Sequence, residues 1–258
     1  MAKSAQNGNP GCELWTRRRV LLYIGAITVA GAGCRRRPSQ PSLSAEMVTL
    51  QRQAFAAALP SCVVRPEQTE GPYFIDDKLN RSDIRVDPSD KSVKPGVPLR
   101  LEFHVSRVAA GACAPLARAI VDVWHCDALG VYSDVHDAGF DTRGKKFLRG
   151  YQQTDAQGHA GFLTIHPGWY EGRAVHIHFK IRSAAEGARS REFTSQLYFD
   201  ESVTAQVFEQ APYNAKSGRR TMNDDDFIFR RDGKQLLLTP TKNAQGYTAT
   251  FDIGLQTT

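Results

Sequence analysis

The sequence predicts a mainly β protein, an antiparallel β-sandwich preceded by a short helix and an export leader. From Cys62 onward, short runs rich in β-branched and aromatic residues are separated by Gly, Pro, Asp and Asn. These runs do not alternate with long helical patterns, which argues against a parallel α/β sheet. About 220 residues follow the leader, enough to bury one substantial hydrophobic core.

Residues 1–34 are predicted to be an export signal of the twin-arginine type. The basic residues 17–19 directly precede an apolar run that ends near Gly33, shorter than the roughly 20 residues of a membrane-spanning helix. Because twin-arginine signals export folded proteins, we expect a periplasmic or extracellular location. Small residues at 30–32 fit a cleavage site. The alternative is a lipid anchor on Cys34, the only membrane attachment that we expect.

Residues 35–60 are predicted to form a linker and a short helix, and residues 61–258 the β-sandwich domain. Pro and Ser are frequent over 38–44, and residues 45–59 fit a helix. Strands are predicted for eight ranges: 99–108, 119–125, 161–165, 174–181, 194–199, 226–229, 235–238 and 247–253. One helical segment is expected over 201–210, and residues 243–246 should form the turn between the last two strands.

Most of the net charge belongs to the leader. The net charge is +6, yet residues 1–37 contain seven basic residues and one acid. The rest of the chain carries 26 basic and 26 acidic side chains. A neutral body offers no broad positive surface, so we expect no nucleic-acid partner.

Three of the five cysteines lie beyond the leader: Cys62, Cys113 and Cys126. An oxidising destination permits one disulfide among them and leaves one thiol. The spacing does not choose the pair.

The strongest chemical signal is the sequence His176-Ile177-His178. Side chains two positions apart in a strand point to the same face, so both imidazoles should project together. Tyr170 and Arg173 lie just upstream. Taken alone, a His-x-His pair is more often an exposed or hydrogen-bonded feature of a strand than a pair of metal ligands.

A second cluster over residues 121–132 ends in Tyr132. Its first half fits a strand, and Gly130 marks a turn that would present Tyr132 just beyond the strand end. The two clusters together supply two tyrosines and two histidines. A phenol, whose ordinary pKa is about 10, ionises at neutral pH only when a strong Lewis acid binds it. Among physiological ions Fe(III) does this best, so the set favours iron.

Five motifs follow one another along the chain: Thr69-Glu70-Gly71-Pro72-Tyr73-Phe74, Val121-Asp122-Val123 ahead of Gly130-Val131-Tyr132, Pro167-Gly168-Trp169-Tyr170, His176-Ile177-His178-Phe179 and Gln196-Leu197-Tyr198-Phe199. In type and order they resemble the intradiol ring-cleaving catechol dioxygenases, non-haem iron enzymes, and most of all their exported single-chain branch. The resemblance covers nearly everything from Cys62 to the C-terminus.

The resemblance implies one non-haem Fe(III) per chain, bound by Tyr132, Tyr170, His176 and His178. It implies that the substrate displaces Tyr170 while Tyr132 stays bound. Arg173 would stabilise charge developing on the ring, and Gln196 would act from behind the ligands. The implied reaction inserts both atoms of O2 into a catechol-type ring and gives a cis,cis-muconate, so the partners are a small aromatic diol and O2.

One departure affects the substrate. The segment between Tyr170 and His176 is shorter than in protocatechuate 3,4-dioxygenase, so the resemblance does not tell which ring substituents are accepted. The sequence also leaves the preferred catechol open and is compatible with a homo-oligomer.

Two other functions remain open. A cupin-like zinc or iron enzyme would use histidines and a carboxylate, and a non-catalytic exported β-sandwich would bind carbohydrate or polyphenol. A zinc site joining the His-x-His pair to His125, Cys126, Asp127 and His136 is disfavoured. His125 and Asp127 would share a strand face opposite to Cys126, so these three side chains could not converge without a bulge.

Overall fold

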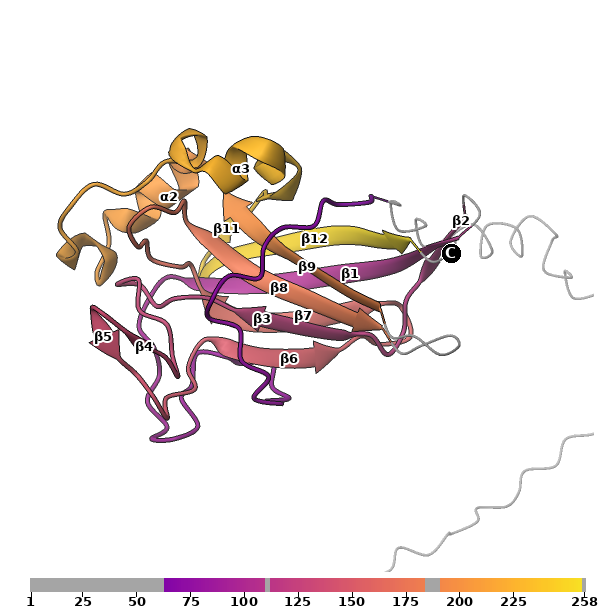
Figure 1. The fold of residues 1–258 in the computed structure, drawn as a ribbon, viewed down its shortest axis with the longest axis horizontal. Helices are drawn as coiled ribbons and strands as arrows, with labels where there is room; N and C mark the ends of the chain where they lie inside the picture. The colour runs from indigo at the N-terminus through magenta and orange to yellow at the C-terminus, as the bar shows by residue number, and fades with distance from the viewer. Residues whose placement is uncertain (1–62, 110–111, 184–190, 257–258) are drawn as a thin grey trace, which may run out of the picture. The chain divides into compact units, whose positions relative to one another are not determined.

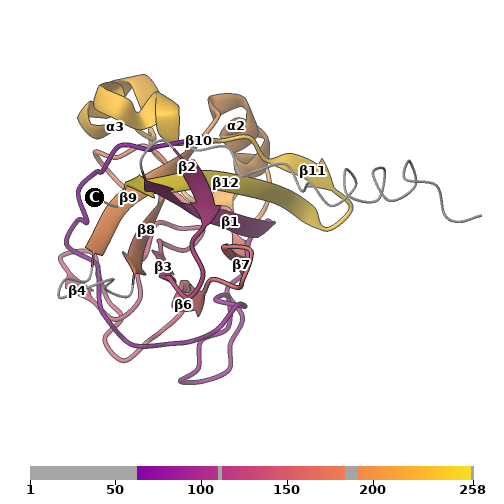
Figure 2. The ribbon, with the colours of Figure 1, turned by 90° about the vertical axis from the view of Figure 1, so that its right-hand side faces the viewer.

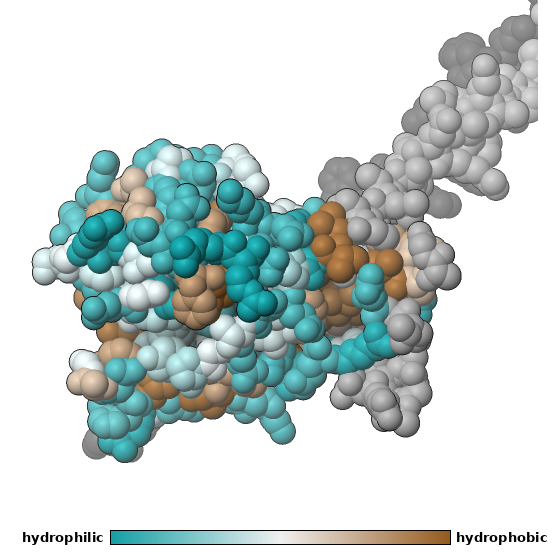
Figure 3. Space-filling view, turned by 45° about the horizontal axis from the view of Figure 1, so that its top comes forward, coloured by the Kyte–Doolittle hydropathy of each residue, from teal (hydrophilic) through white to brown (hydrophobic). Residues whose placement is uncertain are grey.

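The computed structural model describes residues 63–109, 112–183 and 191–256 (Figure 1). The predicted leader, linker and first helix therefore lie outside the described residues. Within the described ranges, no helix is both long and apolar enough to cross a membrane. The face of the molecule in Figure 3 is mostly hydrophilic.

Two five-stranded sheets form the body of the protein. In the first, β1 (Pro98–Ala109) is the central strand, and the strands around it are β12 (Gly246–Gln256), β11 (Thr241–Asn243), β2 (Ala112–Pro115) and β7 (His159–Ile165). The second has the order β10 (Leu237–Leu238), β9 (Arg191–Phe199), β8 (His176–Ser183), β3 (Ile120–Trp124) and β6 (Arg149–Gln153). A small hairpin of β4 (His136–Asp137) and β5 (Phe140–Asp141) stands apart.

Short helices connect the last strands. They are α2 (Glu201–Phe208), α3 (Phe227–Asp232) and the 3₁₀ turns η1 (Tyr213–Ala215), η2 (Asn223–Asp225) and η3 (Gly233–Leu236). In two perpendicular views α2 and α3 lie together on one side of the sheets (Figures 1 and 2).

The hydrophobic core lies between the two sheets. Phe103 of β1 is fully buried, with its ring centre 5.3 Å from that of Phe179 on β8 and 6.1 Å from that of Phe251 on β12. Ile177, Phe179 and Ile181 all belong to this core. Because side chains alternate along a strand, the other residues of β8 must point away from the core, onto the outer face of the second sheet.

The prediction of a mainly β sandwich is confirmed, and most strand pairs are antiparallel. Two pairs are parallel: β12 runs alongside β1, and β10 alongside β9. Six predicted strands correspond to β1, β3, β7, β8, β9 and β12, and the predicted helix corresponds to α2. The turn at 243–246 joins β11 to β12, and β2, β4, β5, β6 and β11 were not predicted as strands.

Two strand predictions were wrong in whole or in part. The segment 226–229 begins α3, because Asp226 caps the helix by accepting hydrogen bonds from the amides of Ile228 and Phe229. The three apolar residues 227–229 are too short a run for their periodicity to separate strand from helix. In the segment 235–238, only Leu237–Leu238 is a strand and the preceding residues complete η3.

The structure distinguishes two of the cysteines. Cys113 is disulfide-bonded, whereas Cys126 is a free buried thiol. One disulfide with a thiol left over matches the expectation from composition.

Candidate active site

The predicted site residues gather on the outer face of the second sheet. His176 and His178 leave β8 on the side opposite to the core residue Ile177, as their spacing predicts. Tyr132 follows β3 on a loop, and Tyr170 lies on the loop that connects β7 to β8. Four side chains from three places in the chain therefore meet beside one strand.

The two imidazoles face each other through their Nε2 atoms, 3.0 Å apart. His176 Nδ1 is 2.6 Å from the carbonyl oxygen of Ala174 and must donate to it, so Nε2 of His176 is left as an acceptor. His178 Nδ1 has no hydrogen-bond partner among the described residues. Burial lowers the pKa of His176 to about 3 and that of His178 well below its ordinary value, so both rings are neutral at pH 7.

Two neighbours restrict the orientation of the His178 ring. The indole of Trp124 stacks on it with the ring centres 5.0 Å apart and 6° between the planes. Gly71, in the segment that precedes β1, lies so near that a Cβ there would be 3.2 Å from His178 Cε1. Its φ of +72° also favours glycine. The Thr69–Phe74 motif thus packs against His178 at Gly71.

Tyr132 is buried, and its hydroxyl makes no well-formed hydrogen bond among the described residues, although the Tyr170 hydroxyl is near enough to interact with it. Its ring stacks on Tyr73 at 4.4 Å and lies edge-on to Tyr170 at 5.7 Å. Burial raises the pKa of Tyr132 well above its ordinary value of 10.0. Without a cation at the site, this phenol stays protonated.

Tyr170 is the more accessible of the two tyrosines. Its hydroxyl is 3.2 Å from His176 Nε2, the acceptor nitrogen, so the phenol donates to the imidazole. Burial raises the pKa of Tyr170 to about 12, although the positive charge of Arg173 acts in the opposite direction.

The loops that carry the tyrosines touch through their backbones. Gly130 has φ +85°, and a Cβ there would lie 2.1 Å from the carbonyl oxygen of Trp169. On the other loop, a Cβ on Gly168 would lie 2.4 Å from the carbonyl oxygen of Ala128. The two glycines allow a contact that brings Tyr132 and Tyr170 to the same place.

Arg173 lies at the edge of this group and is held mainly by Asp226 and Gln196, with a longer contact of 3.5 Å to the Tyr198 hydroxyl. Its Nε donates to Asp226 at 2.9 Å, and an Nη donates to Gln196 Oε1 at 2.5 Å. Gln196 is fully buried on β9 and donates through Nε2 to the carbonyl oxygen of Thr69. Burial alone would lower the pKa of Arg173, but the charges of Tyr170 and Asp226 raise it above its ordinary value.

Gln196 therefore lies behind the group, as predicted, and it bonds Arg173 and the covering segment. The prediction from sequence missed Asp226, which also accepts from the amide of Ala174 at 2.9 Å. Tyr73, in the first of the five motifs, donates its hydroxyl hydrogen to Asp137 on the small hairpin at 2.6 Å. Nothing in the local pattern marks the role of Asp226 at the site, because Arg173 and Ala174 are more than 50 residues away from it.

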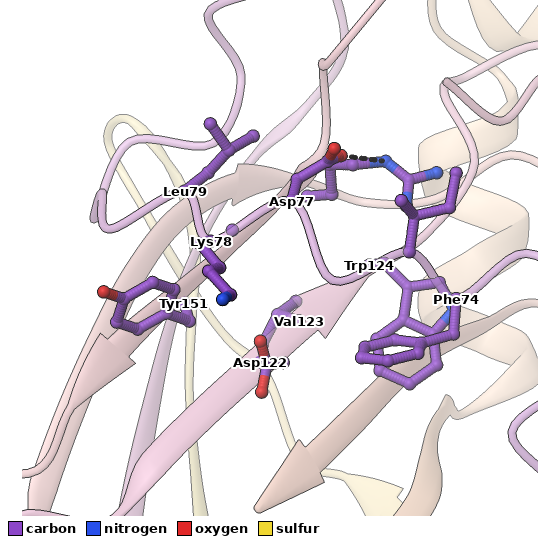
Figure 4. Close-up of a pocket in the computed structure, with 11 residues that line it drawn as sticks. Phe74, Asp77, Lys78, Leu79, Asp122, Val123, Trp124 and Tyr151 are labelled. Atoms are coloured by element: carbon purple, nitrogen blue, oxygen red, sulfur yellow. Dashed lines mark ion pairs between the residues drawn. The ribbon is translucent and has the colours of Figure 1, made fainter. Parts of the chain in front are cut away.

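The cavity in Figure 4 lies on the same outer face, beyond Trp124 and Phe74. Asp122 lines it together with Lys78 and Tyr151. Burial raises the pKa of Asp122 to about 6, but Arg182 pairs with it at 2.8 Å. None of the four predicted ligands lines this cavity, and the ion pair supports a structural role for Asp122.

The four donors fit a metal ion. Two nitrogen ligands that bind one ion at about 2.0–2.1 Å lie about 3 Å apart when they occupy adjacent positions. The Nε2 atoms have this separation, and Tyr132 contributes a buried oxygen without a well-formed hydrogen bond among the described residues. Two phenols with two neutral imidazoles form a set that suits Fe(III).

The alternative zinc site does not assemble. His125 uses both ring nitrogens, since Nδ1 donates to the carbonyl oxygen of Cys126 and Nε2 is 2.6 Å from Thr164 Oγ1. Asp127 pairs with Lys94 at 2.8 Å, and His136 is exposed near Asp141. Across the described ranges, no three His, Cys, Asp or Glu side chains are grouped to hold a metal. A cupin-like set of histidines and a carboxylate is disfavoured for the same reason.

Known proteins are similar to this chain in sequence and fold. The family model described as Dioxygenase matches residues 69–256. The chain belongs to the intradiol ring-cleaving dioxygenases. An intradiol ring-cleavage dioxygenase from Tetranychus urticae is 30% identical, with a TM-score of 0.64, over 76% of this chain and 95% of that one.

Two further dioxygenases are similar to this chain. The dioxygenase domain of a carbohydrate-binding fusion protein from Streptomyces sp. SirexAA-E is 30% identical, with a TM-score of 0.53, over 76% of this chain and all of that domain. The protocatechuate 3,4-dioxygenase beta chain of Burkholderia cepacia is 36% identical over 125 residues, 44% of this chain and 51% of that one. The chain spans about half the length of the first curated relatives that it matches.

Proposed function

We propose that this intradiol dioxygenase uses one non-haem Fe(III) and O2 to cleave a catechol-type ring between its two hydroxylated carbons, giving a cis,cis-muconate. The observation that carries the proposal is the convergence of Tyr132, Tyr170, His176 and His178 on one spot beside β8. Tyr132 and His178 each bring a buried polar atom with no well-formed hydrogen bond among the described residues. A cation bound by Tyr132 would satisfy its phenol and offset the cost of burying it.

The proposed iron would supply Lewis acidity that ionises the bound diol and covalency that makes the ring reactive toward O2. The side chains of the protein would supply ligands that are already oriented. His176 and His178 are held in one tautomer or orientation by Ala174, Trp124 and Gly71, so little reorganisation is needed.

Tyr170 would accept a proton, and Arg173 would stabilise negative charge. Once displaced by the diol, Tyr170 could take up one of its protons, because burial raises the pKa of this phenol to about 12. Arg173, fixed by Asp226 and Gln196, would stabilise negative charge developing on the ring. We expect Arg173→Ala to retain iron and to turn over slowly.

Colour, metal content and oxygen uptake test the proposal together. A protein purified with iron should show the red-brown absorption of tyrosinate bound to Fe(III), and it should consume O2 when catechol, protocatechuate or hydroxyquinol is added. A cupin-like zinc enzyme would be colourless and contain zinc, and a non-catalytic sandwich would neither bind iron nor consume O2. Iron-loaded protein without the absorption band would reject the tyrosine ligands.

We further propose that the chain is exported through its twin-arginine-type signal, with lipidation of Cys34 as the alternative. Basic residues, an apolar run and small residues in that order support this proposal. Membrane fractionation of the natural host protein, compared with a Cys34→Ala variant, separates cleavage from anchoring. Gel filtration would test for a homo-oligomer.

A further inference from the structure

A loop segment outside the proposed iron site contacts both the loop that carries Tyr132 and the loop that carries Tyr170. The segment 213–218 follows α2 and contains η1. Tyr213 donates its hydroxyl hydrogen to the carbonyl oxygen of His166 at 2.6 Å. Its oxygen also accepts from the amide of Val97 at 3.0 Å, so this segment is anchored at the start of the loop that ends in Tyr170.

Lys216 lies three residues after Tyr213, at the place where the two loops meet. Its Nζ is 2.7 Å from the carbonyl oxygen of Leu129 and 2.7 Å from that of Trp169. The same ammonium lies 4.5 Å from the centre of the Trp169 ring, a distance that allows a cation–π contact. An ammonium has three donors and no acceptor, so the two carbonyls satisfy most of its hydrogen-bonding capacity.

The two carbonyls belong to peptide groups that set the tyrosine positions. The Trp169 carbonyl is part of the peptide that begins Tyr170, and the Leu129 carbonyl is part of the peptide that begins Gly130, two residues before Tyr132. The backbones cannot separate while one nitrogen holds both carbonyls. Gly218 completes the contact, because a Cβ there would be 3.0 Å from Trp169 Cη2.

We propose that Lys216 is a positioning residue for ring cleavage, which ties the Tyr132 loop to the Tyr170 loop and keeps both phenols at the site. The catalytic part of this inference rests on the proposed function. The contact of Lys216 with both loop backbones, which we name the clamp, does not depend on a metal. Lys216 acts through the two backbones and touches neither phenol.

Hydrogen exchange of the metal-free full-length protein tests the clamp directly. Lys216→Met keeps the length of the side chain and removes its donors. We expect amide exchange in both segments 127–132 and 167–172 to become about 30-fold faster, the size expected for losing two hydrogen bonds. The core strand β1 should exchange as in the wild type. Lys234→Met, which alters an exposed lysine on η3, should change neither loop.

Activity separates the clamp from the proposed chemistry. We expect Lys216→Met to lower kcat more than it raises KM for catechol, and Lys216→Arg to recover most of kcat by restoring the donors. Unchanged exchange in both loops, or faster exchange in only one of them, overturns the clamp even if the enzyme cleaves catechol. Faster exchange in both loops of a protein that lacks ring cleavage would support the clamp and reject the function.

Discussion

At the scale of single residues, the buried phenol of Tyr132 is the most telling group. A buried hydroxyl without a hydrogen bond costs about 1–3 kcal/mol, and at Tyr132 the proposed function offers a gain that offsets this cost. The proposed gain is an anionic ligand for iron. Tyr247 on β12 provides a comparison, because its hydroxyl is also buried and without a partner in the described part of the chain.

We predict that Tyr132→Phe loses the iron absorption band and at least about 100-fold in kcat/KM, because it removes a ligand that the substrate does not displace. Its free energy of unfolding without metal should stay within about 1 kcal/mol of the wild type, since no well-formed hydrogen bond is lost. Metal analysis, absorption spectra and urea denaturation measure these effects. Tyr247→Phe should leave iron and activity intact, and retained ring cleavage in Tyr132→Phe would contradict the assignment.

At the scale of elements, the contact between the tyrosine loops depends on glycine. Gly130 and Gly144 have nearly the same φ, +85° and +84°, but their surroundings differ. A Cβ on Gly130 would overlap the Trp169 carbonyl, whereas a Cβ on Gly144 would meet no heavy atom within 4 Å. Alanine substitutions at these two glycines therefore distinguish the effect of backbone strain from the effect of steric overlap.

We expect Gly144→Ala to lower the free energy of unfolding by about 1–2 kcal/mol, the strain of a left-handed alanine. Gly130→Ala should cost at least twice as much, because the two loops must also move apart, and it should reduce iron binding. Urea denaturation and iron titration test both variants. Equal effects of the two substitutions would mean that the loop contact does not position the tyrosines.

The N-terminus of α3 links helix capping to the charge of Arg173. Asp226 caps this helix with one oxygen and bonds Arg173 and Ala174 with the other. Burial alone would raise the pKa of Asp226, but the amide of Ala174 and the charge of Arg173 lower it, so the carboxylate stays ionised. Asp200 caps α2 in a similar way without any bond to Arg173.

We predict that Asp226→Asn lowers kcat about tenfold and costs roughly 3 kcal/mol of stability, because asparagine cannot replace the buried charge that pairs with Arg173. Asparagine is itself a good N-cap, so Asp200→Asn should stay within about 0.5 kcal/mol of the wild type and retain kcat. Steady-state kinetics and urea denaturation provide both values. A normal kcat in Asp226→Asn would show that Arg173 needs no fixed partner.

At the scale of the whole molecule, buried neutral histidines link stability to pH. Burial lowers the pKa of His125 to about 4 and that of His166 to about 3. Between pH 6.5 and these values the unfolded chain binds protons that the folded chain does not, so acid favours unfolding. Their contribution is complete above about pH 6.5 and is lost as the pH falls toward the folded pKa values.

We predict that the free energy of unfolding of the metal-free protein decreases between pH 6.5 and 4, by at most about 1.4 kcal/mol per pH unit for each histidine. His166 is packed among aromatic rings and its Nε2 has no partner within the described ranges, so His166→Phe keeps the packing and removes one hydrogen bond, from Nδ1 to the carbonyl oxygen of Pro167. This variant should have a shallower slope over that range in urea denaturation. The same slope as the wild type would mean that His166 is already protonated when folded.

The sequence by itself determined the sandwich architecture and the face of His176 and His178. Both follow from local periodicity: core residues alternate along the strands, and two histidines two positions apart must share a face. The two tyrosines could be named because they fall in motifs of an intradiol dioxygenase, and the structure brings them to the histidines. Their ligand roles remain a prediction.

Only the tertiary structure decided what holds these groups in place. Asp226 looked like part of a strand, yet it caps α3 and anchors Arg173 from 53 residues away. Lys216 carries no local signal, and its two carbonyl partners lie 87 and 47 residues away. A strand's alternation is written into neighbouring residues, whereas a contact between distant loops depends on how the whole chain packs.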